Sequence, residues 1–334
     1  MTLCIESMQR KWRNLLLGGV CIVFLVLIGW GIKKVGQNLI KDNPKHRKPG
    51  SIVRIDDNMY KIEKELGSGC CGIVYKAVPH TSSKKTPESI PQPLAIKIIH
   101  KPGKVDCETR MLQTVPDHPN VIHIHKLGHA KSGEPSIVME YIPDSLHSLD
   151  STILHDPHRI RTIMYQLLQA VKHLHEHDVV HRDIKPSNIL YRKPSSEAVL
   201  TDFGHARYTV DGRLRRGYAY ARGTHSYFAP EGLKKEEHQD RSLDLWSLGC
   251  IFGKLVCKHT LFKDHDDVDD IVRDQTEFVK TQKWNEWNEW NERFPKSKKL
   301  AKDLLQSMLQ IDPKMRPSAE ECLEHEWFHT EQFP

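Results

Sequence analysis

The chain has 334 residues, enough for one domain of about 250–280 residues and further segments outside it. Its net charge of +6 is too small to indicate a nucleic-acid-binding protein, and much of the excess lies beside an apolar run near the N-terminus. The eight cysteines form no Cys-x-x-Cys pair, which argues against a zinc ribbon or a disulfide framework and favours a reducing compartment.

The first predicted element is a single transmembrane helix at residues 15–32, after an N-terminal segment at 1–14. These eighteen residues carry no charge and would form a helix of about 27 Å, close to the thickness of the hydrocarbon core. Basic residues flank the run, with more of them in the linker predicted at 33–58, so we expect the C-terminal part in the cytosol. A buried globular helix and a cleaved signal peptide are the alternatives.

Glycines predict a tight turn between two strands at residues 59–78. Gly67, Gly69 and Gly72 form the pattern G-x-G-x-x-G, and glycine lets backbone N–H groups approach phosphate oxygens closely. A plain hairpin is the alternative; a dinucleotide site would need a helix directly afterwards, whereas β-prone residues follow. The candidate nucleotide-binding residues of this turn are Leu66, Gly67, Ser68, Gly69, Cys70, Cys71, Gly72 and Val74. The two cysteines are either reactive thiols or inert loop residues.

A predicted strand at residues 94–99 carries one charged side chain, Lys97, among apolar residues that include Ala95. Glu108, eleven residues later, is the candidate partner for this lysine, on a short helix that follows a Pro-Gly turn. The alternative is that Glu108 is a solvated surface residue.

Two further strands are predicted at residues 121–129 and 135–140. The second ends in a segment from which Met139, Glu140 and Ile142 are candidate pocket residues. Histidines occur at positions 123, 125 and 129 and again at 173, 175 and 177, but this spacing does not converge on one point. We therefore do not expect a zinc site there.

A charged stretch follows a predicted amphipathic helix at residues 159–176. Residues 181–190 read HRDIKPSNIL, with a carboxylate, two cations and a carboxamide within eight positions. Such a cluster does not suit a core strand, because buried charges must be paired or ligated; a solvated turn is the alternative. Asp202 comes next, in the sequence Thr-Asp-Phe-Gly.

The segment from Asp202 to Glu231 holds four arginines in its middle and no serine or threonine between Asp211 and Gly223. A regulatory phosphate carried there must therefore lie on Tyr218 or Tyr220. The alternative is a loop that is ordered without phosphate.

The remaining predicted elements are two helices, at residues 244–256 and 300–309, and the first of them is very apolar. Between them, Trp-Asn-Glu repeats three times at 284–292. Aromatic residues every third position form a drifting stripe, so we expect a partly buried helical insertion, with a docking surface as the alternative.

These motifs, taken in order, resemble those of eukaryotic-type serine/threonine protein kinases over about residues 60–330. The stretch 181–190 resembles the catalytic loop H-R-D-x-K-x-x-N, 202–204 resembles D-F-G, 94–97 resembles V-A-I-K, and 229–231 resembles A-P-E. The resemblance implies an α+β, bilobal kinase fold: a β-rich N-lobe and hinge at 59–142 and a larger, mainly helical C-lobe at 143–330.

The resemblance also implies roles in ATP-dependent phosphorylation of protein substrates, with no nucleic-acid partner. Asp183 would accept the proton of the substrate hydroxyl and Lys185 would offset charge on the γ-phosphoryl group. Lys97 and the glycine turn would hold ATP, and Asn188 and Asp202 would ligate Mg²⁺. The positions implied for the adenine are Met139 as gatekeeper and the backbone of Glu140 and Ile142.

Further residues would support the site. Asp244 would brace the catalytic loop, Arg316 would pair with Glu231, and Arg182 would face an activation-loop phosphate. The implied activation segment includes Asp202, Phe203, Gly204, Tyr218, Tyr220, Thr224, Ala229, Pro230 and Glu231.

The hinge and the region before the catalytic loop look most similar to the cyclin-dependent-kinase-like group. Phe228 stands where those relatives carry arginine, and the region around Glu108 has no recognisable cyclin-binding pattern. A cyclin-like activator is therefore not supported. The alternatives to an active membrane-anchored kinase are a pseudokinase or membrane-tethered scaffold, and a kinase-like enzyme acting on a small molecule.

Overall fold

A computed structural model describes residues 46–69, 71–80, 93–100, 108–109, 111–149, 156–214, 225–234, 239–265, 267–281 and 295–330. Several predictions fall outside these residues: the transmembrane helix at 15–32, the repeat at 284–292, and Cys70, Tyr218, Tyr220 and Thr224. Within the described ranges, no helix has the length and apolar character needed to cross a membrane.

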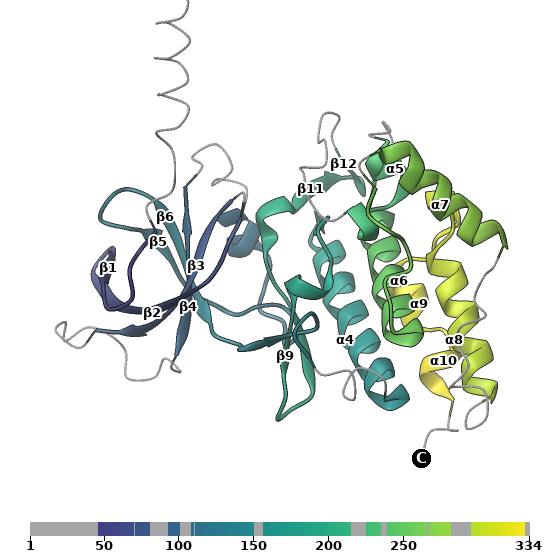
Figure 1. Ribbon diagram of the computed structural model, residues 1–334, viewed down its shortest axis with the longest axis horizontal. Helices are drawn as coiled ribbons and strands as arrows, with labels where there is room; N and C mark the ends of the chain where they lie inside the picture. Colours follow the sequence, from purple (N-terminus) through teal and green to yellow (C-terminus); the bar gives the residue numbers. More distant parts are fainter. Residues whose placement is uncertain are drawn as a thin grey trace, which may run out of the picture. The chain divides into compact units, whose positions relative to one another are not determined.

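The smaller lobe is a six-stranded sheet in the order β1-β2-β3-β4-β6-β5, with every neighbouring pair antiparallel (Figure 1). Strand β1 alternates exposed and buried side chains, as expected for a strand covered on one face, and β4 is buried throughout, as expected for an apolar strand covered on both faces. Their bounds are β1 Ile52–Ile55, β2 Asn58–Ser68, β3 Gly72–Pro79, β4 Leu94–Ile99, β5 Ile124–His129 and β6 Pro135–Glu140.

One predicted boundary is wrong. Residues 33–58 were expected to form a linker, but Ile52–Ile55 form strand β1, which pairs with β2. Val53 and Ile55 are buried in the cluster of apolar residues on one side of the sheet, so this short segment belongs to the lobe. Four residues beside a basic run are too short to be recognised from alternation alone.

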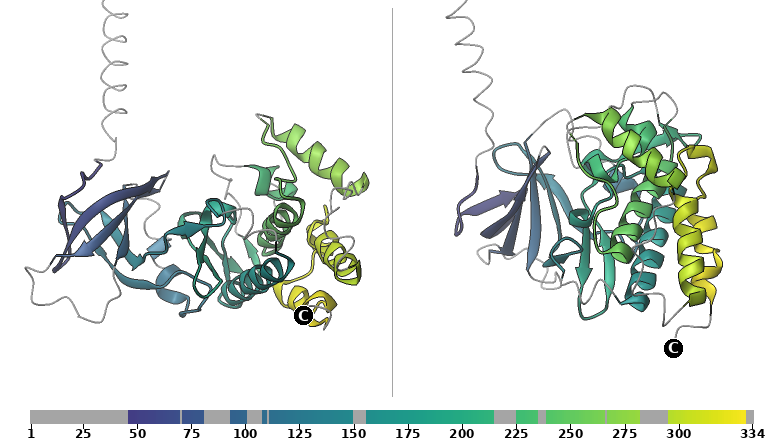
Figure 2. Two further views of the ribbon diagram at one scale, coloured as in Figure 1. Left: turned by 60° about the horizontal axis from the view of Figure 1, so that its bottom comes forward. Right: turned by 45° about the vertical axis from the view of Figure 1, so that its right-hand side comes forward.

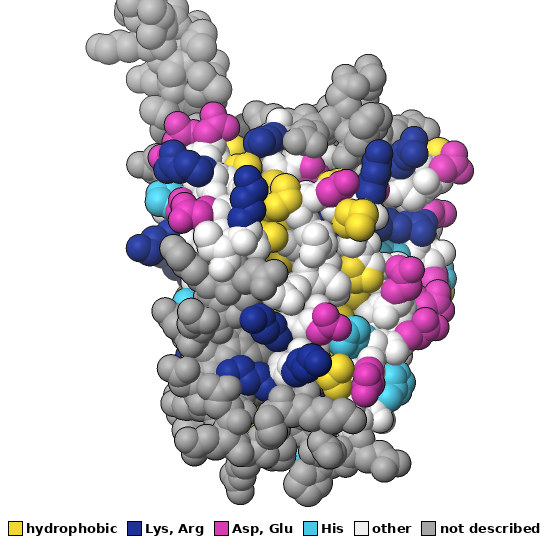
Figure 3. All heavy atoms as spheres, turned by 90° about the vertical axis from the view of Figure 1, so that its right-hand side faces the viewer, with side chains coloured by type: hydrophobic (Ala, Val, Ile, Leu, Met, Phe, Trp, Pro, Cys, Tyr) yellow, Lys and Arg dark blue, Asp and Glu magenta, His cyan; other side chains and the backbone are white. Residues whose placement is uncertain are grey.

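The larger lobe is mainly helical, and Figure 2 shows its helices apart from the six-stranded sheet. The helices are α4 Pro157–Glu176, α5 Pro230–Leu233, α6 Ser242–Cys257, α7 Val268–Thr281, α8 Pro295–Met308, α9 Ala319–Leu323 and α10 Glu326–His329. Asp156 caps α4 by accepting a hydrogen bond from the backbone N–H of His158, and Pro157 suits the first helical position. On the face that carries α7 and α8, acidic and basic side chains are interspersed (Figure 3).

Short strands of two to four residues lie before and between the helices of the larger lobe. They are β7 Asp144–Ser145, β8 Val179–Val180, β9 Ile189–Arg192, β10 Glu197–Leu200, β11 Arg207–Val210 and β12 Arg213–Leu214. Two of them, β9 and β10, pair as an antiparallel hairpin between the catalytic stretch and Asp202.

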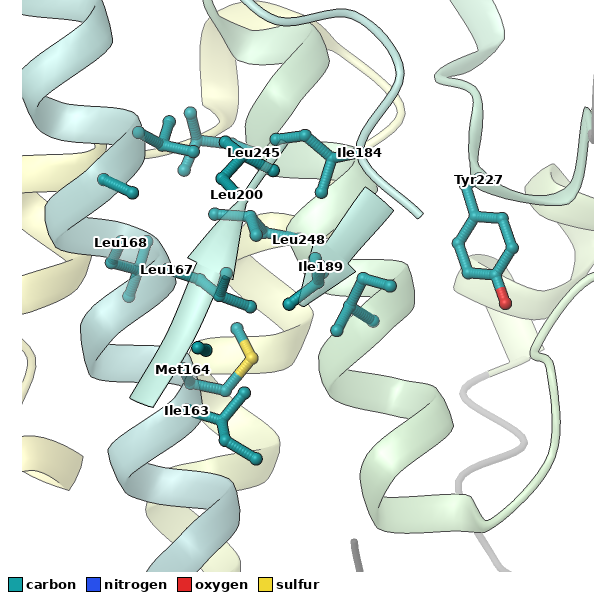
Figure 4. Close-up of a cluster of buried hydrophobic side chains, with 14 of the residues drawn as sticks. Ile163, Met164, Leu167, Leu168, Ile184, Ile189, Leu200, Tyr227, Leu245 and Leu248 are labelled. Atoms are coloured by element: carbon teal, nitrogen blue, oxygen red, sulfur yellow. The ribbon is translucent and has the colours of Figure 1, made fainter. Parts of the chain in front are cut away.

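The core of the larger lobe anchors the catalytic stretch from below. Apolar residues of α4 pack with Ile184 and Ile189 of the stretch and with Leu245 and Leu248 of α6 (Figure 4). These side chains are essentially inaccessible to solvent, and α6 is buried along most of its length. The chain is therefore held rigidly on both sides of Asp183, and the predicted α+β architecture with two lobes is confirmed for the described residues.

Candidate active site

A cavity of about 560 Å³ lies where residues of the sheet meet residues of the catalytic stretch. The glycine turn contributes to its wall, and so do β4, the end of β6 and the segment around Asp202. Of the predicted nucleotide-binding residues, those that line it are Leu66, Gly67, Ser68, Gly69, Cys71, Gly72, Val74, Ala95, Lys97, Glu108, Met139, Glu140 and Ile142. The residues that the sequence motifs predicted for nucleotide binding thus form part of the wall of this cavity.

Lys97 joins two carboxylates that come from different parts of the chain. Its Nζ lies 2.6 Å from Glu108 Oε1 and 2.8 Å from Asp202 Oδ1. Burial lowers the pKa of Lys97, but the carboxylates of Asp202 and Glu108 outweigh burial, and the pKa lies above its ordinary value. Lys97 is therefore charged, and the predicted Lys97–Glu108 ion pair is present despite the short spacing between the two residues.

The two carboxylates respond differently to this environment. Burial raises the pKa of Glu108, and Lys97 offsets that only in part. Burial acts in the same direction on Asp202, but there the Lys97 ammonium dominates and the pKa of Asp202 is lowered. Asp202 is therefore an anion at neutral pH, as a carboxyl group that ligates a cation must be.

Asp202 is held in a left-handed backbone conformation, with φ 66°. This region is costly for residues other than glycine and is found where surrounding contacts enforce it. The enforcing contacts are the hydrogen bond from the Gly204 backbone N–H and the burial of Phe203, whose ring packs edge-on against that of His181. Asp202 is thereby tied to the catalytic stretch.

Three side chains of the catalytic stretch converge on one another. Lys185 Nζ donates to both carboxylate oxygens of Asp183, at 3.0 and 2.8 Å. Asn188 Nδ2 donates to Asp183 Oδ2 and to its backbone oxygen, each at 2.9 Å. Because the Asn188 nitrogen is engaged in this way, its oxygen is the atom that remains for a cation.

Asp244 braces the backbone of the stretch, as predicted. Its carboxylate accepts hydrogen bonds from the backbone N–H groups of His181 and Arg182, each at 2.8 Å, and its Oδ2 lies 3.0 Å from His175 Nε2. Burial raises the pKa of Asp244, but the hydrogen bond with His175 and the neighbouring charges lower it overall. This contact stabilises Arg182, whose φ of 68° is also left-handed.

The glycines of the turn divide into two kinds. A Cβ on Gly72 would come within 2.3 Å of the Ile98 backbone oxygen, so this glycine is required by the approach of β3 to β4. A Cβ on Gly67 or Gly69 would meet nothing within 4 Å. Open space beside their backbone is what a phosphate-binding turn needs.

Comparison with known proteins agrees with this geometry. A sequence model of the protein kinase domain family matches residues 60–328. The chain belongs to the protein kinase family. The serine/threonine-protein kinase DCLK3 of Mus musculus is 30% identical over 305 residues, which cover 86% of this chain and 35% of the mouse protein. The mitogen-activated protein kinase mpkA of Aspergillus fumigatus is 29% identical over 303 residues, which cover 82% of this chain and 70% of the fungal protein. The chain thus spans about a third of the length of the mouse relative.

The kinase site contains donors that fit Mg²⁺. Asp202 supplies a carboxylate and Asn188 a carboxamide oxygen, and hard cations of this kind prefer oxygen ligands. Both line the cavity, together with the Lys97 ammonium. Within the described ranges, no group of three or more histidine, cysteine, aspartate or glutamate side chains is arranged to hold a metal ion.

The end of the activation segment is fixed by a buried ion pair. Arg316 forms a two-pronged contact with Glu231, with nitrogen–oxygen distances of 2.6 and 2.8 Å, and both side chains are almost inaccessible to solvent. Ala229 precedes helix α5 and Pro230 begins it. The predicted pairing of Arg316 with Glu231 is confirmed.

Some features of the kinase site were missed in the sequence. The hydroxyl groups of Thr114 and Tyr208 lie 2.5 Å apart and connect the helical segment that follows Glu108 to strand β11. No local pattern predicts a contact between residues so far apart in the chain. Apolar wall residues were also missed, although strand alternation could have found several of them: Leu112, Ile122, Ile124, Ile137 and Leu190.

Proposed function

We propose that the protein transfers the γ-phosphoryl group of Mg·ATP to serine or threonine hydroxyls of proteins, and that residues 15–32 anchor it in a membrane. The observation that supports the catalytic part is the meeting of Lys97, Asn188 and Asp202 at one cavity, with Asp183 hydrogen-bonded to Asn188 beside it. Kinase catalysis consists mostly of positioning and charge neutralisation, and these residues supply both.

In the proposed reaction the hydroxyl oxygen of the acceptor bonds to the γ-phosphorus, the bond to the β-phosphate oxygen breaks, and ADP leaves. Asp183 accepts the hydroxyl proton, and Lys185, 2.8 Å from it, lies where it can offset charge on the moving group. Lys97 and the amides of the glycine turn hold the nucleotide phosphates. Mg²⁺, held by Asn188 and Asp202, neutralises phosphate charge when it is bound.

A pseudokinase scaffold is the second candidate. Its support was the short spacing between Lys97 and Glu108, yet these side chains lie 2.6 Å apart. That distance removes the argument, and we favour the active enzyme. The likeness to cyclin-dependent kinases remains a prediction.

Phosphoryl transfer with Mg·ATP to peptides that differ only in a serine, threonine or tyrosine acceptor tests the proposal. We expect phosphate on serine and threonine, and we expect loss of incorporation when EDTA removes Mg²⁺. Incorporation on tyrosine alone, or none on any peptide, would contradict the proposed function.

The anchor is a proposal from the sequence, and carbonate extraction of membranes tests it. The full chain is expected to stay in the membrane pellet, and a variant without residues 15–32 is expected to appear in the supernatant, because the uncharged run supplies the apolar contact. Retention of the deletion variant would contradict anchoring by this segment. Loss of an N-terminal tag from the mature chain would instead indicate a cleaved signal peptide.

A further inference from the structure

A second cavity, of about 680 Å³, adjoins the catalytic stretch, and no described residue of the glycine turn is among those that line it. It shares Lys185 and Ser187 with the nucleotide cavity. The rest of its wall comes from His147, Pro186, the end of the activation segment, Lys254 of α6 and the loop after α6. Because Lys185 contacts Asp183 directly, this cavity lies beside the carboxylate that an acceptor hydroxyl must reach.

Some of the charged side chains that line the second cavity have close partners and others do not. Lys185 is paired with Asp183, and Asp264 accepts hydrogen bonds from the Ser226 backbone N–H and hydroxyl, at 2.8 and 2.7 Å. Lys254 and Lys263 remain, and within the described ranges neither forms an ion pair with a carboxylate. Lys254 donates only a long hydrogen bond, 3.4 Å, to the Thr260 hydroxyl.

Of the described residues, Asp264 is the one carboxylate that lines the cavity. Asp269 and Asp270 belong to the first turn of α7, where they suit the helix dipole, and neither lines the cavity. Asp270 is paired with Arg273 at 2.8 Å. The described wall of the cavity beside the catalytic base therefore carries three lysines and one carboxylate. Because Lys185 is paired with Asp183, the two cations Lys254 and Lys263 face the single carboxylate of Asp264, and positive charge is in excess.

Lys254 lies in the last turn of α6, where the helix dipole favours a cation whatever the function of the protein. That preference explains a cation at this helix end. It does not explain Lys263, which lies beyond the helix, nor the meeting of both lysines and His147 at one cavity.

We propose that this cavity is a substrate subsite for an anionic side chain, a carboxylate or a phosphorylated residue, within about four residues of the acceptor hydroxyl. The inference rests on the proposed function, since Asp183 defines where the acceptor lies. An extended peptide advances about 3.3 Å per residue, so four residues reach across a groove of this kind. Lys254 and Lys263 determine specificity by attracting the anion.

Peptides with a serine acceptor and one replaced position, from four residues before to four after it, test the subsite with the full chain. Each position carries alanine, glutamate, arginine or phosphoserine. At one or more positions we expect glutamate or phosphoserine to raise kcat/KM about three- to tenfold over alanine, the range of a partly exposed ion pair, and arginine to lower it. Glutamate and phosphoserine distinguish a carboxylate from a phosphorylated partner.

Charge reversal assigns the preference to residues. Lys254→Glu is expected to abolish the preference or turn it toward arginine. Lys263→Glu, at an exposed position where folding is insensitive, is expected to weaken it. Lys258→Glu is the matched control, because it changes the same charge at the same helix end outside the cavity, and it should leave the preference intact.

The outcomes separate this inference from the function on which it rests. Phosphorylated peptides with no anionic preference, or a preference that neither Lys254→Glu nor Lys263→Glu changes, would overturn the subsite and leave the kinase activity standing. No phosphorylation of any peptide by the wild-type chain would overturn both.

Discussion

Replacing Lys97 by methionine is expected to lower kcat/KM for phosphoryl transfer by at least about 100-fold, the scale of losing a preorganised charge at the reacting group. Lys97 is 5% exposed and contacts both Glu108 and Asp202. Methionine has a similar length but no charge, so the variant loses the cation that would hold the nucleotide phosphates. Steady-state kinetics with Mg·ATP and a serine peptide measure the effect.

Two variants make the Lys97 result specific. Lys76→Met changes a lysine on the neighbouring strand β3. Because the ion pair of Lys76 with Glu63 is partly exposed, this variant should keep kcat/KM within about twofold of wild type. Lys97→Arg keeps the charge but changes its shape, so we expect it to restore little activity. Wild-type kinetics in Lys97→Met would contradict the role of this lysine.

Replacing Arg316 by leucine is expected to lower the free energy of unfolding by about 3–5 kcal/mol, the cost of leaving a buried charge without its partner. Glu231 would keep its carboxylate in a site that is 2% exposed. Arg316 also donates to the Gln310 backbone oxygen, and its guanidinium lies 5.0 Å from the centre of the Trp246 ring. The loss therefore removes several contacts at the base of the activation segment.

Urea denaturation followed by tryptophan fluorescence measures this loss. Arg273→Leu is the matched control, because its ion pair with Asp270 is exposed and should contribute less than about 1 kcal/mol. A double variant that exchanges the charges, Glu231→Arg with Arg316→Glu, should recover part of the stability. An unfolding free energy for Arg316→Leu equal to that of Arg273→Leu would show that the buried pair does not stabilise the fold.

The catalytic centre was predictable because its residues lie in short, fixed patterns. Asp183, Lys185 and Asn188 occupy one stretch, and their mutual hydrogen bonds follow from that spacing. The role of Glu108 was harder to predict, because the short segment between Lys97 and Glu108 left it undecided whether the two side chains form an ion pair. The deciding contact depends on how the following helical segment is placed against Lys97, which only the folded structure shows.

Features that depend on distant residues were not predictable. The second cavity brings together Lys185, Ser226, Lys254 and Lys263, which come from four separate segments. The hydrogen bond between Thr114 and Tyr208 joins residues 94 positions apart. A single sequence carries no periodicity that would connect such residues, whereas the packing of α4 and α6 against the catalytic stretch brings several of these segments together.

The most direct test of the central claim compares the wild-type chain with Asp183→Asn in the transfer of labelled phosphate from Mg·ATP to a protein substrate. Asparagine keeps the size of the side chain but cannot accept the hydroxyl proton, so we predict a loss of about 100- to 10,000-fold. Asp211→Asn, the same change at an exposed position, should retain full activity. Equal incorporation by the wild type and Asp183→Asn would contradict the proposed active site.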